Sequence, residues 1–197
     1  MTGRADRVIQ NQLEAVRRPP DNRATRFGPT TVVALVALLV VLAATTGVAT
    51  ASPSAGCGSG GARSTAKMRC LLNEARTQRG LRPLVHSTSL DRAARLRAAA
   101  IRRCDDFSHT PCGRSFGSAY NAAGYSVATH SVAENLAWGT GSLSTAASTL
   151  GTWLGSSEHR HNLLGRSWRK VGVAVVVAPE LQGVQNAVVW VAEFGEP

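Results

Sequence analysis

Beyond position 65, the apolar residues first recur with the period of an amphipathic helix. Over residues 66–79 they occupy the i, i+3, i+4 and i+7 positions of one helix face, namely Met68, Leu71, Leu72 and Ala75. Gly80 follows this run, and glycine is a typical residue for ending a helix. The pattern therefore predicts a first helix with one buried stripe.

Three more helices are predicted downstream, over residues 89–103, 116–123 and 144–154. Ser87 or Thr88 is the expected N-cap of the first of these, because a short hydroxyl side chain accepts a hydrogen bond from a free backbone N–H there. The residues expected to be buried in that helix are Leu90, Ala93, Ala94, the aliphatic stem of Arg97, Ala98 and Ile101. The residues expected on the apolar face of the last helix are Ala147, Leu150 and Leu154.

Two continuous apolar runs close the chain, at residues 171–178 and 187–194. The segment between them contains Pro179 and Gly183, which favour a turn. The runs do not alternate between apolar and polar positions, so we expect both strands to be covered on both faces. An antiparallel hairpin inside a sheet with helices on either side, in a mixed sandwich-like domain, is the predicted result.

The beginning of the chain is organised as an export signal. Residues 1–29 are polar and basic, residues 30–48 carry no charge, and residues 49–51 read Ala-Thr-Ala, the small-x-small form of a signal-peptidase site. The apolar run also approaches the length of a membrane span, so a cleaved signal peptide and an uncleaved anchor over residues 30–51 are both open. A Gly/Ser-rich linker is predicted for residues 52–65, and everything after Ala51 is expected to be exported.

The net charge of the chain is +10. Residues 1–51 contribute +3, from six arginines against three carboxylates, and the remainder contributes +7, from sixteen basic against nine acidic residues. Such a balance favours anionic surroundings, for example a lipid headgroup surface or a phosphate-bearing wall polymer. Nucleic acid is not the expected partner, because the arginines are scattered and the export signal directs the chain out of the cytosol.

The chain has four cysteines, and in an exported protein they are expected to form disulfides. A short loop favours the pair Cys104–Cys112, which would leave Cys57–Cys70 as the second pair. Pairing of Cys70 with Cys112 or with Cys104 stays open, because spacing alone does not distinguish these connectivities.

Three segments each place a histidine or a carboxylate among apolar and aromatic neighbours, and they centre on His109, Glu134 and His159. Neutral imidazole and carboxylate groups together suit Zn²⁺ or a related divalent ion. The gaps of 25 residues between these positions are not a metal motif by themselves. The chain also has no Gly-x-Ser-x-Gly element and no cysteine free of an expected pairing, so no catalytic nucleophile is predicted.

Several short motifs occur in one order along the second half of the chain. They are Asn-Glu-Ala-Arg at 73–76, Phe-Ser-His at 107–109, Glu-Asn-Leu-Ala-Trp-Gly at 134–139, the segment 153–164, Val-Gly-Val-Ala at 171–174, and Trp190 with Phe194-Gly195. This series resembles the bacterial, SCP-like branch of the CAP superfamily, named for cysteine-rich secretory proteins, antigen 5 and pathogenesis-related proteins, over residues 66–197. The resemblance implies an extracellular α+β domain, an α-β-α sandwich with a central, mostly antiparallel sheet.

The family's shallow cleft commonly presents two histidines, able to hold zinc, and two acidic residues. By position, His109 and His159 match the histidines and Glu134 matches one acidic residue. The second acidic position falls at Ser156, so one carboxylate is absent, and Glu158 is its possible substitute. The resemblance therefore implies a three-group metal site made of His109, Glu134 and His159.

These observations lead us to expect a non-catalytic extracytoplasmic domain that binds a partner or a lipid-like ligand at the cell envelope. The alternative is a metal-assisted hydrolase acting on protein or wall substrates, in which zinc would activate water and Glu134 would act as base. A purely structural adhesin without metal is a third possibility. The missing second carboxylate favours binding over hydrolysis.

Overall fold

The computed structural model describes residues 55–58 and 60–196. This part comprises the predicted CAP domain and the end of the predicted linker. The predicted basic region, residues 1–29, and the predicted signal peptide or anchor, residues 30–51, lie outside the described residues. Within the described part, no helix combines the length and the hydropathy that crossing a membrane requires.

A four-stranded sheet forms the centre of the domain, in the order β1-β3-β4-β2. Its strands are β1 (Val85–His86), β2 (Val132–Gly139), β3 (Lys170–Leu181) and β4 (Val184–Gly195). β1 pairs in parallel with β3, and the other two pairings are antiparallel. The sheet is thus mostly antiparallel, as predicted, and β2 forms one of its edges.

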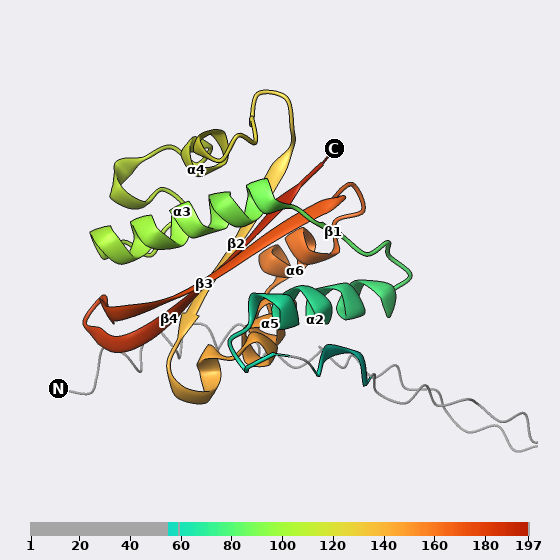
Figure 1. Ribbon diagram of the computed structural model, residues 1–197, viewed down its shortest axis with the longest axis horizontal. Helices are drawn as coiled ribbons and strands as arrows, with labels where there is room; N and C mark the ends of the chain where they lie inside the picture. Colours follow the sequence, from blue (N-terminus) through green and yellow to red (C-terminus); the bar gives the residue numbers. More distant parts are fainter. Residues whose placement is uncertain (1–54, 59, 197) are drawn as a thin grey trace, which may run out of the picture.

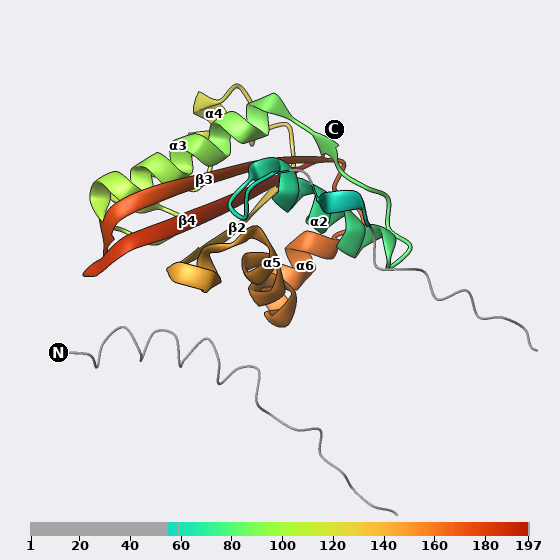
Figure 2. The same ribbon diagram turned by 60° about the horizontal axis from the view of Figure 1, so that its bottom comes forward.

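Helices cover both faces of this sheet (Figure 1 and Figure 2). On one face lie α3 (Thr88–Cys104) and α4 (Ser118–Ala122), and on the other lie α2 (Thr65–Thr77), α5 (Ala146–Gly155) and α6 (Ser157–Leu164). Short 3₁₀ turns occur at η1 (Ala55–Cys57), η2 (Pro111–Gly113) and η3 (Gly141–Ser144). The arrangement is an α-β-α sandwich, which confirms the predicted α+β fold class for this part of the chain.

The first two predicted helices form with nearly the predicted bounds. Ser64 caps α2 and Ser87 caps α3, each accepting a hydrogen bond from a backbone N–H of the first turn. Gly80 follows α2 with φ +66°, a left-handed conformation that glycine adopts without steric cost. Of the predicted stripe positions in these two helices, Leu71 is only partly buried, and the others are buried.

The later helices and the final hairpin differ from the prediction in detail. Thr145 caps α5, and the buried face of that helix is rotated so that Ala147 is exposed. Its buried residues are Ala146, Thr149, Leu150 and Trp153. Pro179 lies within β3, and the turn forms at Gln182 and Gly183, whose φ angles of 50° and 81° suit a tight hairpin turn.

Neither β2 nor α6 is predicted from the sequence. β2 carries Glu134 and Asn135 in mid-strand, which interrupts the apolar pattern on which the prediction of the other strands rests. α6 has no apolar stripe, since Leu163 is its one buried residue. Both elements are therefore positioned by tertiary contacts rather than by a periodic pattern of their own.

The continuous apolar run of β4 is explained by burial on both faces. Trp190, Ala192 and Phe194 pack in the cluster that contains α2 and α5, whereas Val189 and Val191 pack in the cluster under α3. Gly172 on β3 allows α3 to lie close to the sheet, because a Cβ there would stand 2.1 Å from the backbone of Leu90. The sheet is therefore a central layer with no water-facing side along these positions.

The cysteines pair as Cys57–Cys70 and Cys104–Cys112. This confirms the favoured connectivity and excludes both alternatives for Cys70. The first bridge ties η1 to α2, and the second ties the end of α3 to η2, close to the loop that carries His109.

Candidate functional site

The strand register brings together two carboxylate side chains that are far apart in sequence. Glu134 on β2 lies directly opposite Glu193 on β4. Both residues are buried, with 4% and 0% of their surfaces exposed. Two carboxyl groups in such a position repel each other unless cations or protons compensate their charge.

Arg97 supplies that compensation to Glu134, and His109 adds a hydrogen-bonding partner. Arg97 Nε donates to Glu134 Oε2 over 2.6 Å, and His109 Nδ1 lies 2.6 Å from Glu134 Oε1. The guanidinium of Arg97 also donates to the carbonyl oxygen of Phe116 and packs over its ring. Helix α3 thus delivers a buried cation, and the loop after it delivers a half-exposed histidine, to the same carboxylate.

Among the described residues, Glu193 has no cationic partner of its own, and its environment favours the protonated acid. Burial, and then the charge of Glu134, raise the pKa of Glu193 well above its ordinary value. The Tyr120 hydroxyl contacts both Glu193 Oε2 and the Ala133 carbonyl oxygen. Since one phenol proton does not serve two acceptors, a protonated Glu193 completes this set of hydrogen bonds. Burial and the charge of Glu134 thus favour the protonated form of Glu193.

Glu193 is absent from the site predicted from the sequence, although a signal for it exists. It is the one charged residue inside the continuous apolar run 187–194. A single carboxylate in a strand that is buried on both faces must be paired or protonated. The residue across the strand pair, however, becomes known only from the register.

His159 reaches the same edge of the sheet from the opposite layer. Ser156, the position of the missing acidic residue, instead caps α6, and its Oγ accepts from the His159 backbone N–H. Asn135 on β2 donates to the His159 carbonyl oxygen over 3.0 Å, and Asn162 donates to Asn135 Oδ1. These bonds tie the start of α6 to β2, next to Glu134.

The ring of His159 is partly buried and incompletely paired. Burial, and then the neighbouring His109 ring, lower the pKa of His159, against a smaller opposite effect of Glu158. Its Nδ1 is buried and has no hydrogen-bond partner among the described residues. A neutral imidazole with an unpaired ring nitrogen is the form that binds a metal ion.

The three predicted site residues therefore lie near one another, but their contacts differ. His109 and Glu134 are in direct contact, and His159 lies close enough to His109 for that ring to lower its pKa. Their ligand atoms are not all within 4.8 Å of one another. Glu158 is exposed on α6. In the described part of the chain, the one group of His, Cys, Asp or Glu that meets that distance contains Cys57 and Cys70, which are joined in a disulfide.

Two residues of this cluster, His109 and His159, carry ring nitrogens of the kind that bind divalent metal ions. Glu134 accepts from Nδ1 of His109, which leaves the Nε2 lone pair of that ring as the free ligand atom. His159 offers its unpaired Nδ1. Both oxygens of Glu134 are already engaged, so its place in such a site is to orient His109.

Known structures with the same fold support this description of the domain. An outer surface protein from Borrelia burgdorferi is similar with a TM-score of 0.54 and 21% identity, over 66% of this chain and 89% of that one. An extracellular protein containing a SCP domain from Bacillus anthracis has a TM-score of 0.54 and 21% identity, over 66% of this chain and 39% of its own. A cysteine-rich secretory protein from Staphylococcus aureus has a TM-score of 0.51 and 18% identity, over 66% of this chain and 37% of its own.

Sequence comparison identifies the family itself. No curated protein is significantly similar to the chain in sequence. Residues 71–194, more than half of the chain, match the family described as "CAP: Cysteine-rich secretory protein family". With the α-β-α sandwich and the ordered motifs that this region carries, the chain belongs to the CAP family.

Proposed function

We propose that this protein is an extracytoplasmic CAP-domain protein that acts at the cell envelope by binding a partner or a lipid-like ligand. In this proposal, His109 and His159 hold a divalent metal ion such as Zn²⁺, and Glu134 orients His109. The ion would supply a positive charge that orders the cluster or bridges to the ligand. No catalytic residue and no organic cofactor are part of the proposal.

Three observations support a location outside the cytosol. The two disulfides are typical of proteins that fold in an oxidising compartment. Two of the structural relatives are described as an outer surface protein and an extracellular protein. The apolar segment at residues 30–48 is consistent with export, either as a cleaved signal or as an anchor.

The observation that carries the metal proposal is the buried, unpaired Nδ1 of His159 beside a His109 ring oriented by Glu134. A buried ring nitrogen without a partner is costly, and a bound cation would remove that cost. Since burial lowers the pKa of His159, this ring is neutral and available as a ligand near neutral pH.

Hydrolysis is less well supported than binding. A metal-assisted hydrolase would need Glu134 as a base that takes a proton from water. The Glu134 side chain has no exposed surface, and each of its oxygens accepts a short, charge-assisted hydrogen bond. Glu193 is a second carboxyl group in this cluster, but it is fully buried and its pKa is raised, so it does not replace the missing cleft carboxylate.

Calorimetric titration of the purified protein with Zn²⁺ tests the metal proposal. We expect one ion to bind to the wild type and no binding to the double variant His109→Ala, His159→Ala. The control is His130→Ala, His161→Ala, which removes two histidines outside the cluster and should bind zinc like the wild type. Loss of binding in both double variants, or none in the folded wild type, would refute the metal site.

A further inference from the structure

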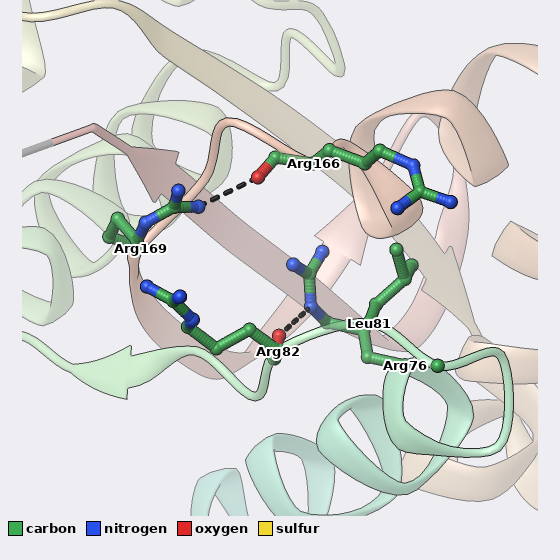
Figure 3. A pocket seen from close by; sticks show the side chains of 6 residues that line it. Arg76, Leu81, Arg82, Arg166 and Arg169 are labelled. Carbon is green, nitrogen blue, oxygen red and sulfur yellow. Dashed lines mark hydrogen bonds between the residues drawn. The ribbon is translucent and has the colours of Figure 1, made fainter.

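A second group of charged side chains lines a cavity on another part of the domain. The cavity, of about 300 Å³, lies between the loop after α2 and the loop that joins α6 to β3. It is lined by four arginines and two other residues, namely Arg76, Gly80, Leu81, Arg82, Arg166 and Arg169 (Figure 3). None of the six is acidic, so the cavity concentrates positive charge.

Arg76 is the buried arginine among the residues that line this cavity. Its surface is 1% exposed, and its guanidinium donates to the carbonyl oxygens of Arg82, Leu163 and Gly165. These bonds join the loop after α2 to the end of α6, and they use the Nε and Nη1 atoms. Carbonyl groups are dipoles without net charge, so the buried positive charge itself is not neutralised.

Arg169 adds a second positive charge that is also held in place. Its Nη1 donates to the carbonyl oxygens of Arg166, Ser167 and Trp168, which fixes the guanidinium against its own loop. Burial, and then the charge of Arg169, lower the pKa of Arg76. The two guanidinium groups therefore repel each other across the cavity.

Arg82 and Arg166 are the exposed members of the set. Neither side chain makes a hydrogen bond within the described part of the chain, and none of the four cavity arginines forms an ion pair there. In Figure 3 the guanidinium of Arg82 turns toward the side on which Arg169 lies, whereas the side chain of Arg166 extends the other way, over α6. The cavity is thus lined by two arginines whose side chains are hydrogen-bonded to other described residues and two whose side chains are not.

Basic character continues beyond Arg166. A second, more open hollow of about 430 Å³ shares Arg166 with the cavity and is lined as well by Ser157, Arg160, His161, Leu164 and Gly165. The cavity is therefore the deeper part of a wider basic surface at the end of α6, and a ligand larger than one anion has space to extend.

We propose that this four-arginine cavity binds the phosphate group of an anionic ligand. Guanidinium groups present planar N–H pairs that match phosphate oxygens, and such charge-assisted bonds are about twice as strong as neutral ones. The ligand would neutralise the charge that the protein leaves uncompensated at Arg76 and Arg169. This phosphate site is distinct from the proposed metal site at His109 and His159. His159 lies in the first turn of α6, whereas the cavity lies beyond the last turn of that helix.

The shape of the cavity favours a single phosphate with its immediate carrier over a nucleic acid strand. Pockets for small ligands begin at about 300 Å³, which is the size found here. The lining contains no aromatic side chain on which a base would stack. The phosphate has two possible sources, a soluble phosphate ester or an anionic lipid headgroup, and they share this chemistry.

The test compares the wild-type full chain with Arg82→Gln, Arg166→Gln and with a control of equal net charge, Arg92→Gln, Arg95→Gln. The control residues are exposed on α3, on the other face of the sheet. Arg76 is left intact, because its loss would unfold the loops that it joins. Glycerol phosphate titrated by calorimetry probes the soluble source, and vesicles of phosphatidylglycerol against phosphatidylcholine probe the lipid source.

We expect the cavity variant to weaken binding of at least one probe about tenfold, and the control to weaken it less than about twofold. An effect on glycerol phosphate alone would assign a soluble ligand, and an effect on phosphatidylglycerol vesicles would assign a lipid headgroup. Residues 1–54 are identical in all three proteins, so they do not contribute to the difference. Equal losses in both variants, or no binding of either probe by the wild type, would overturn the proposal.

Discussion

The domain contains two groups of charged side chains that differ in how their charge is balanced. At the edge of β2, Glu134 is paired with Arg97 and His109, and burial beside Glu134 raises the pKa of Glu193. At the end of α6, four arginines line a cavity, and none of them has an ionic partner in the described part of the chain.

The first group of charges holds the protein together, whereas the second carries positive charge that a bound anion would neutralise. In the first group, Arg97 and His109 pair both oxygens of Glu134, and the buried atoms without a hydrogen-bond partner among the described residues are His159 Nδ1 and Glu193 Oε1. Removing one of its members should therefore mainly cost stability. The arginine cavity gains from an outside anion, so changing it should affect binding more than folding.

The largest expected effect is the loss of stability in Arg97→Ala. This change leaves Glu134 and Glu193 buried without the guanidinium, and removing one partner of a buried ion pair costs about 3–5 kcal/mol. Urea unfolding at neutral pH measures the loss. The exposed Arg95→Ala on the same helix should change the free energy of unfolding by less than about 0.5 kcal/mol. Similar losses in both variants would show that Arg97 is not a compensating cation.

A smaller effect is expected in the pH dependence of stability at Glu193. Its pKa is raised on folding, so its contribution is fully present below the unfolded pKa and is lost as the pH rises through the folded pKa. The free energy of unfolding of the wild type should therefore decrease above about pH 4.3, by at most about 1.4 kcal/mol per pH unit from this group. Since a side-chain amide resembles the protonated acid but does not titrate, Glu193→Gln should remove this decrease.

Urea unfolding of the wild type and Glu193→Gln from about pH 4.5 to about pH 8.5, the range above the unfolded pKa, measures that difference. Glu180→Gln is the control, because Glu180 is an exposed carboxylate on β3 whose loss should leave the slope unchanged. Parallel pH curves for the wild type and Glu193→Gln would contradict a protonated Glu193.

The smallest expected effect comes from introducing a carboxylate side chain at the arginine cavity. Arg166→Glu places a carboxylate near the remaining arginines, so stability should rise by about 0.5 kcal/mol, as for an exposed ion pair. Stabilisation by added glycerol phosphate, measured as a shift in Tm, should disappear. Arg95→Glu on α3 should keep the phosphate-dependent shift. A shift retained in Arg166→Glu would mean that the anion binds elsewhere.

The sequence predicts the parts of this fold that have strong local patterns. The stripe and cap of α3 and the final hairpin follow from local spacing, the short loop favours the Cys104–Cys112 bridge, and the ordered motifs identify the family. β2 and α6 are not predicted, because their polar residues serve contacts with each other, such as that of Asn135 with His159. The sequence pattern of one helix or strand does not show which residues of another element it will contact.

The candidate site shows the same division at the level of single residues. The sequence alone determined that His109, Glu134 and His159 are chemically notable and, through its ordered motifs, that the domain is an α-β-α sandwich. Only the tertiary structure decided that Glu134 is paired with Arg97, that Glu193 lies across from it, and that four arginines share one cavity. The physical reason is that charge compensation depends on distances between side chains, which strand register and loop packing set, and not on separation along the chain.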